Sequence, residues 1–266
     1  MVKLYNTFWG RYLLRFITLP FISNLAGKIL DSRISCVAIK PFIKSNNIDM
    51  SDFVYEKWSS FNDFFTRKVK AGARPIDINE NSFISPCDGL LSIYNIDEKT
   101  IMNIKGSYYT VASLLNNKEL ANDYKNGLCF VYRLTPAHYH RYCYFDSGFK
   151  GQNIHIKGVY HTVQPFAVEN MPVYRMNTRE YTILNTDNFN KVIFMEVGAL
   201  MVGRICNYHN EYKFKRGDEK GRFEFGGSTI IVIVKENTVK VNKDILEHNG
   251  EFPVKMGEKI GISLTK

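Results

Sequence analysis

A short run near the C-terminus, Ile230–Val234, constrains most strongly how this chain can fold. Every residue in it is apolar and β-branched, which is typical of a strand buried on both faces. Gly226 and Gly227 come just before it and are followed by Ser228. Adjacent glycines allow positive φ and close backbone approach, so we expect Ser228 at a tight turn. An ordinary Gly-Gly turn would give the same pattern, and the rest of the chain must decide between the two.

Short apolar runs separated by Gly, Pro, Asn and Asp continue through most of the chain after Ser82. They cover residues 83–84, 90–96, 129–134, 154–159, 181–184, 192–197, 230–234 and 260–264. Such density predicts short, mostly antiparallel strands, with one helix over residues 111–122. We therefore expect an α+β fold, in which a helical, basic N-terminal region (1–70) precedes a β-rich catalytic body (71–266).

The N-terminal stretch from Trp9 to Leu30 is apolar at helical spacing and carries Arg11, Arg15 and Lys28. Its longest uncharged run, 16–27, is shorter than the ~20 residues that span a bilayer. The segment fits an amphipathic helix at a membrane interface, and equally a helix packed on the protein's own core. A signal peptide is a third interpretation, which the arginines inside the apolar stretch disfavour.

Charge and cysteine usage narrow the function classes. The formal net charge is +9 and aromatic residues make up 14% of the chain, a combination suited to an anionic surface. No arginine-rich run or zinc-finger spacing is present, so a membrane is favoured over nucleic acid as the partner. The 5 cysteines are widely spaced without a C-x-x-C pair, which favours a reducing cytoplasm and disfavours thiolate-bound zinc.

Three polar groups could carry chemistry. Asp88 lies between a proline-containing segment and Gly89, although Asp-Gly is also an ordinary turn. His138 and His140 are spaced as His-x-His and could bind a metal together with His161. Alternatively, one of these histidines acts as a general base. Ser228 supplies a hydroxyl nucleophile, although it lies outside the G-x-S-x-G pattern of hydrolases. Together, an aspartate to orient, a histidine as base and this serine as nucleophile could form a catalytic set.

Several segments together resemble phosphatidylserine decarboxylases, in matching order and over nearly the whole chain. They are Phe64-Phe-Thr-Arg67, Ala73-Arg-Pro-Ile76, Ser85-Pro-Cys-Asp-Gly89, Tyr139-His-Arg141 and the stretch 219–229, which contains Gly-Gly-Ser-Thr. The resemblance implies a pyruvoyl-dependent carboxy-lyase of phospholipid biosynthesis that is made as a proenzyme. The alternative that the residues leave open is a metal-dependent β-barrel enzyme using His138, His140 and His161.

The resemblance also implies how the cofactor arises. The zymogen would cleave itself autocatalytically between Gly227 and Ser228, giving a β chain of residues 1–227 and an α chain of residues 228–266. Ser228 would become the N-terminal pyruvoyl group, the only cofactor, and no metal would be required. This group would form a Schiff base with phosphatidylserine, release CO2 and yield phosphatidylethanolamine.

The same resemblance suggests roles for the polar residues. Asp88 would orient and stabilise a charged histidine. His140 matches the first histidine of the family pattern Tyr-His-Arg-x-His, but Cys143 occupies the second position. We therefore expect His140 to be the base, with His161 as a second candidate and a Cys143 thiolate as a third. The expected location is peripheral, on the cytoplasmic side of the cell membrane, bound to its anionic surface; whether a homo-oligomer forms is left open.

Overall fold

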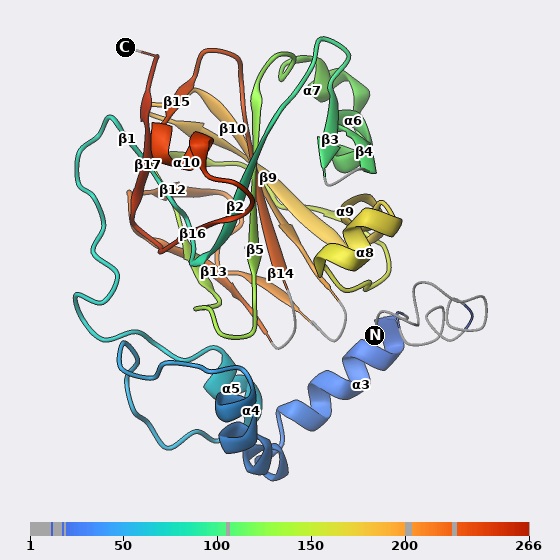
Figure 1. The fold of residues 1–266 in the computed structure, drawn as a ribbon, viewed down its shortest axis with the longest axis vertical. Coiled ribbons are helices and arrows are strands. Elements are labelled where there is room, and N and C mark those ends of the chain that lie inside the picture. Colours follow the sequence, from blue (N-terminus) through green and yellow to red (C-terminus); the bar gives the residue numbers. More distant parts are fainter. Residues whose placement is uncertain are drawn as a thin grey trace.

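A computed structural model describes residues 12, 18, 20–104, 107–199, 204–224 and 228–265. The chain begins with an N-terminal helical layer, which we define as residues 20–67 (Figure 1). Its elements are α3 (Pro20–Leu30), the 3-10 helix η1 (Arg33–Ala38), α4 (Ile39–Ser45) and α5 (Phe61–Phe65). Within the described residues, no helix is long and apolar enough to cross a bilayer.

The rest of the chain forms a β-rich body. Its strands are β1 (Ser82–Ile84), β2 (Gly89–Asn95), β3 (Ile101–Ile104), β4 (Ser107–Thr110), β5 (Leu128–Leu134), β6 (Arg141–Cys143), β7 (Gly148–Lys150), β8 (Ile154–Ile156), β9 (Arg179–Thr186), β10 (Lys191–Val197), β11 (Ile205–Asn207), β12 (Tyr212–Phe214), β13 (Glu219–Phe223), β14 (Ser228–Val234), β15 (Val239–Val241), β16 (Phe252–Val254) and β17 (Lys259–Ser263). Short helices α6 (Val111–Leu115), α7 (Lys118–Asn122), α8 (Pro165–Asn170), α9 (Val173–Met176) and α10 (Lys243–Glu247) connect them. The expected α+β fold is confirmed.

A large antiparallel sheet organises this body. Within the described residues it has 9 strands, in the order β12-β7-β9-β10-β14-β5-β2-β16, with β8 added beside β9. Smaller sheets, β1-β17-β15 and β11-β13-β6, accompany it, together with the hairpin β3-β4. Strand β14 runs through the middle between β10 and β5, and all of its residues are buried. The β-branched run Ile230–Val234 therefore belongs to the central strand.

The single helix expected over residues 111–122 is wrong in one respect, because two short helices form there. Asn116 adopts a left-handed conformation at φ 51° and ends α6. Asn117 then caps α7 through its side chain, which accepts a hydrogen bond from the N–H of Leu120. Asparagine tolerates the left-handed region and caps helices well, so this pair breaks the helix.

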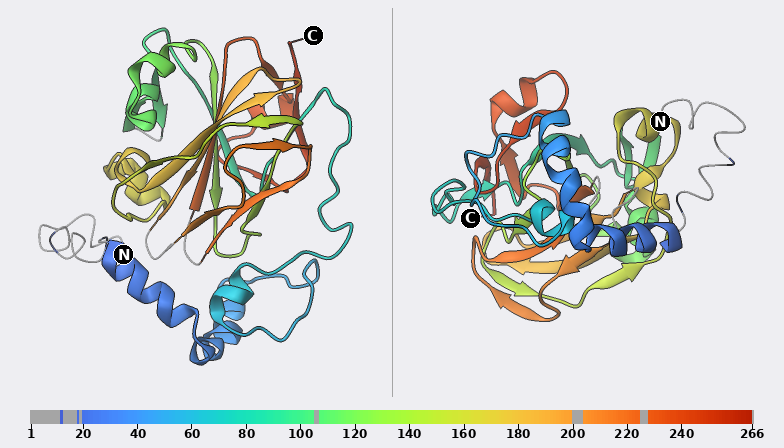
Figure 2. Two further views of the ribbon diagram at one scale, coloured as in Figure 1. Left: turned by 180° about the vertical axis from the view of Figure 1, so that it is seen from behind. Right: turned by 90° about the horizontal axis from the view of Figure 1, so that it is seen from below.

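The helical layer has its own small core and lies across one end of the large sheet (Figure 2). Ile39, Ile48, Phe61, Phe64 and Phe65 are buried together there. Two arginines link the layer to the loop after β5 and to the start of β6. Arg67 Nη2 donates to the carbonyl of Ala137 at 3.1 Å, and Arg141 Nε donates to the carbonyl of Thr66 at 2.9 Å. The covered end is the one at which β14 begins (Figure 1).

Candidate active site

Three neighbouring strands end or begin at this covered edge. Ser228, the first residue of β14, pairs with Leu134, the last residue of β5. On the other side of β5, strand β2 begins at Gly89, directly after Asp88. Neighbouring strands lie about 4.8 Å apart, so the sheet brings Asp88, the end of β5 and Ser228 into one row. Asp88 and Ser228, which are far apart in the sequence, therefore lie at the same edge of the sheet, on either side of β5.

Ser228 is fully buried, and its Oγ has no hydrogen-bond partner among the described residues. The Oγ1 of Thr229 is in the same situation. A buried hydroxyl without a partner is unfavourable for folding and therefore calls for a functional explanation. Gly226 and Gly227, the latter forming the other half of the expected cleavage site, lie outside the described residues.

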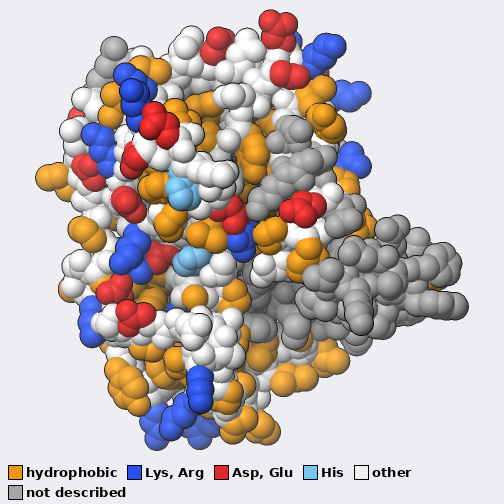
Figure 3. Space-filling model, in the orientation of Figure 1, with side chains coloured by type: hydrophobic (Ala, Val, Ile, Leu, Met, Phe, Trp, Pro, Cys, Tyr) orange, Lys and Arg blue, Asp and Glu red, His pale blue; other side chains and the backbone are white. Residues whose placement is uncertain are grey.

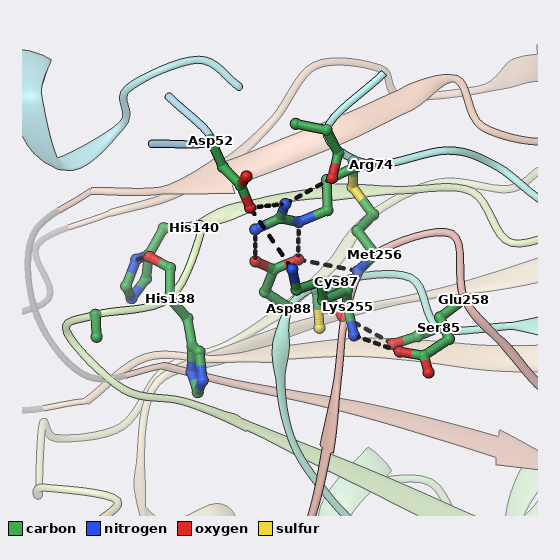
Figure 4. A network of polar contacts seen from close by, with 12 residues as sticks. Asp52, Arg74, Ser85, Cys87, Asp88, His138, His140, Lys255, Met256 and Glu258 are labelled. Atoms are coloured by element: carbon green, nitrogen blue, oxygen red, sulfur yellow. Dashed lines mark hydrogen bonds and ion pairs between the residues drawn. The ribbon is translucent and has the colours of Figure 1, made fainter. Parts of the chain in front are cut away.

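Asp88 is buried and bound by an arginine, whereas the sequence suggested a histidine partner. Arg74 Nε donates to Asp88 Oδ1 at 2.7 Å and Arg74 Nη2 donates to Oδ2 at 2.6 Å (Figure 4). The backbone N–H of Met256 also donates to Oδ1, at 2.9 Å. Arg74 Nη1 reaches further, to Asp52 Oδ2 at 2.8 Å. Arg74 therefore ties the aspartate of the sheet to the helical layer.

His140 is fully buried and held in one tautomer. Its Nδ1 lies 2.9 Å from the carbonyl oxygen of His138, and since a carbonyl only accepts, Nδ1 carries the hydrogen. The lone pair is then on Nε2, which has no partner among the described residues. Burial and the nearby charge of Arg67 hold the pKa of His140 well below its usual range. The ring is therefore neutral near pH 7, the state that a general base needs.

Arg67 lies beside His140 without a carboxylate partner in the described part of the chain. Its guanidinium carbon is 4.1 Å from the ring centroid of Phe53 and 5.0 Å from that of Phe64. Burial lowers the pKa of Arg67 to about 10, so it remains charged at neutral pH. Arg67 and Arg74 belong to two of the family-like motifs, but the sequence did not predict a role for either in the site. Residue type alone does not distinguish these two arginines from surface arginines. Only their position within the motifs could have marked them as site residues.

The other two candidate bases are placed differently. Cys143 is buried, and burial raises the pKa of its thiol to about 12, so a thiolate is disfavoured at neutral pH. His161 is also buried, and burial lowers its pKa. The backbone of His161 exchanges two hydrogen bonds of 2.8 Å with the Asn177 amide, which also donates to the carbonyl of Gly198 at 2.7 Å. Gly198 follows β10, the neighbour of β14, so His161 is linked to the site through Asn177.

A cavity of about 790 Å³ opens between the helical layer and the sheet. Asp88, Arg74 and His138 line it from the body, and Asp52 and Phe53 line it from the helical layer. Its volume falls within the range of sites for small ligands. The described residues contain no group of three or more His, Cys, Asp or Glu side chains that could hold a metal ion. The metal-dependent alternative is therefore not favoured.

The chain is similar to known proteins over most of its length. The family model for phosphatidylserine decarboxylase matches residues 61–262. The chain belongs to the phosphatidylserine decarboxylase family. The family resemblance read from short motifs is thus confirmed, and the matched range includes Asp88, both loop histidines and Ser228.

Curated relatives extend the likeness beyond the family model. A phosphatidylserine decarboxylase proenzyme 2 from Clostridium acetobutylicum is 47% identical over 262 residues, covering 97% of this chain and 90% of the relative. A phosphatidylserine decarboxylase proenzyme from Clostridium botulinum is 45% identical, covering 93% and 86% of the two chains. One from Clostridium tetani is 42% identical, covering 91% and 84%. The similarity to these three relatives therefore covers more than nine-tenths of this chain.

Proposed function

We propose that the chain is a phosphatidylserine decarboxylase proenzyme that cleaves itself between Gly227 and Ser228. The mature enzyme would convert phosphatidylserine to phosphatidylethanolamine and CO2. The observation that carries this proposal is the Ser228 hydroxyl, which is buried, without a hydrogen-bond partner among the described residues, and located at the first position of the central strand. Support comes from His140, which is neutral and lies in the connection after β5, the strand whose last residue pairs with Ser228. Its Nε2 has no partner among the described residues.

In the proposed cleavage, Ser228 Oγ attacks the carbonyl carbon of Gly227 while its proton passes to Nε2 of His140. The C–N bond breaks and the proton is delivered to the departing nitrogen, leaving an ester. Removal of the Ser228 α-proton then expels the Gly227 carboxylate and leaves a dehydroalanine. Tautomerisation and hydrolysis by one water give the pyruvoyl group and ammonia. His161 is the second candidate for these proton transfers.

The surroundings of Ser228 fit a cofactor that is fixed in the chain. Strand β14 is paired along its length with β5 and for most of it with β10, so its first residue has little freedom to move. A pyruvoyl group at this position would supply a carbonyl that condenses with the substrate amine and accepts the electron pair left by CO2. The cavity lined by Arg74, Asp88 and His138 is the proposed place for the serine headgroup. Asp88 would contribute its carboxylate to this site while Arg74 holds that carboxylate in place.

The mass of the purified protein tests this proposal. We expect two chains, residues 1–227 and 228–266, with the second lighter than its serine-started form by the mass of one ammonia molecule. The same preparation should release CO2 from vesicles that contain phosphatidylserine. An intact single chain that leaves phosphatidylserine unchanged would contradict both the cleavage and the reaction.

The helical layer supports peripheral binding to the anionic cytoplasmic face of a membrane. Leu25, Ile29, Ile34 and Val37 are exposed apolar residues, and Ile34 and Val37 expose 82% and 78% of their surface. Basic side chains accompany them, including Lys28, Arg33, Lys40 and Lys44. Figure 3 shows apolar and basic side chains gathered over this end of the molecule. Exposed apolar residues beside lysines are typical of surfaces that enter the headgroup region of anionic bilayers.

Replacing Ile34 and Val37 with glutamate should abolish flotation with vesicles rich in anionic lipid. Both side chains are exposed, so the fold should be retained while an apolar contact is lost and negative charge is introduced. A matched control is Ile78→Glu, because Ile78 is also exposed, at 88%, but lies outside the helical layer. The membrane proposal fails if the double variant floats as well as the wild type.

A further inference from the structure

Arg67 is a buried cation that uses few of its hydrogen-bond donors. Only 3% of its surface is exposed, yet its Nε and Nη1 atoms have no hydrogen-bond partner among the described residues. The guanidinium lies over the rings of Phe53 and Phe64 instead of beside a carboxylate. Burying a charge without a paired opposite charge is unfavourable for folding. An arginine in this state therefore calls for a functional explanation.

Arg141 shows that the junction between the helical layer and the body can be made without an unpaired charge. Like Arg67, it crosses this junction by donating to a backbone carbonyl. Its charge is balanced, because Arg141 Nη1 also donates to Glu219 Oε1 at 2.8 Å. Arg67 Nη2 contacts only backbone carbonyls within the described residues. Holding the layer in place therefore does not explain why the charge of Arg67 is left uncompensated.

One carbonyl oxygen joins Arg67 to His140. Arg67 Nη2 donates to the carbonyl of His138 at 3.4 Å, as well as to that of Ala137 at 3.1 Å. The Nδ1–H of His140 donates to the same His138 oxygen at 2.9 Å. The ring of His140 also lies against that of Phe65, two residues before Arg67, with the ring centroids 4.0 Å apart. The segment that carries Arg67 therefore contacts both the imidazole and its hydrogen-bond acceptor.

Of the titratable groups that act on His140, Arg67 is the one that is charged at neutral pH. Within the described residues, the charges of Arg67 and His138 both lower the pKa of His140. His138 is neutral near pH 7, because burial lowers its own pKa. The N–H of Thr135 donates to Nδ1 of His138 at 2.9 Å, so the hydrogen of this neutral ring is on Nε2. Arg67 has a pKa of about 10 and keeps its charge.

We infer that Arg67 is a positioning residue for His140: it holds the carbonyl that orients the imidazole, and its charge keeps the Nε2 lone pair free of a proton. This inference rests on the proposed self-cleavage, in which that lone pair takes the Oγ proton of Ser228. A like charge disfavours protonation, so Arg67 extends the pH range in which His140 is a base toward acid. The same charge makes the protonated ring a stronger acid, which favours delivery of the proton to the departing nitrogen.

Substitutions that separate charge from hydrogen bonding test the inference. Arg67→Gln keeps an N–H donor without the charge, whereas Arg67→Lys keeps both a donor and the charge. Self-cleavage of freshly synthesised precursor is followed on denaturing gels between about pH 4 and pH 8. We expect the acidic limb of the rate profile to move up by about one pH unit in Arg67→Gln and to stay in place in Arg67→Lys. Arg141→Gln is the matched control. It loses a contact at the same junction, but the limb should not move, because Glu219 balances the charge of Arg141.

NMR of the uncut Ser228→Ala precursor with isotope-labelled histidine reads the ring directly. The His140 signal is identified by its loss in a further His140→Gln variant. It should show a neutral ring with its hydrogen on Nδ1 at about pH 6.5, the ordinary pKa of histidine. The pKa read from this signal should rise when Arg67→Gln is added. This measurement of the precursor with Arg67 intact remains informative even if substitution of Arg67 prevents folding.

Three results would overturn the inference. They are a His140 ring that is charged at about pH 6.5, a neutral ring with its hydrogen on Nε2, and an acidic limb that does not move in Arg67→Gln. Equal loss of rate in Arg67→Gln and Arg67→Lys without a shift of the limb would assign Arg67 a purely structural role. In each case the wild-type chain still cleaves, so the proposed function stands. Failure of the wild type to cleave at all would instead refute the proposed function.

Discussion

Ser228→Ala is expected to yield one uncut chain of 266 residues without decarboxylase activity. The variant lacks the only atom from which the proposed ester can form, so neither the break nor the pyruvoyl group can arise. Because the Ser228 hydroxyl has no hydrogen-bond partner among the described residues, its removal breaks no such bond. Stability should therefore be unchanged or slightly higher. Denaturing gels, intact mass, product formation and urea unfolding measure these effects.

Ser228→Thr is the matched control for this variant. It keeps the hydroxyl nucleophile and adds one methyl group at a fully buried position. We expect slower cleavage because overpacking displaces the reacting atoms, and a second chain heavier than the wild-type one by a methylene group. Cleavage of Ser228→Ala at the same bond would rule out the proposed role of the hydroxyl.

Lys220→Met is expected to destabilise the fold by about 3–5 kcal/mol, the range for breaking a buried ion pair on one side. Lys220 and Glu196 are both fully buried, and Lys220 Nζ contacts the Glu196 carboxylate. Lys220 Nζ also donates to Asn207 Oδ1 at 2.6 Å. Burial already raises the pKa of Glu196, and without the lysine its carboxylate would be uncompensated. Urea unfolding of the wild type and the variant measures the difference.

The pH dependence of this loss has a definite sign. An acid whose pKa is raised in the folded state makes the fold less stable as the pH rises above its unfolded pKa. The deficit of Lys220→Met should therefore be larger at pH 8 than at pH 5, where Glu196 can be protonated. A double variant, Lys220→Met with Glu196→Leu, should recover most of the stability, since an apolar pair often replaces a buried ion pair without loss. A wild-type urea midpoint for Lys220→Met would show that the pair contributes nothing.

The strands that sequence patterns predicted well are the long, buried ones. Strands β5, β10 and β14 are nearly continuous apolar runs, and such runs have few alternatives to a central strand. Strands β6, β7, β11, β12 and β13 were not predicted. Most of these have only 3 residues and mix polar with aromatic side chains, so pairing with distant neighbours decides their conformation. Similarly, the sequence predicted helices early in the chain but not which of their residues would be exposed.

The sequence by itself determined the central strand, the Gly-Gly-Ser segment before it and the family, because each is carried by consecutive residues. The tertiary structure decided how the polar groups are used. The partner of Asp88 is Arg74, 14 positions away, and the charge near His140 comes from Arg67, which contacts a carbonyl 70 positions away. The tautomers of His138 and His140 depend on which backbone group each ring meets. Burial and hydrogen bonding depend on the residues that surround each side chain in the folded protein. No local sequence pattern could therefore have shown that Nε2 carries the lone pair in His140 and the hydrogen in His138.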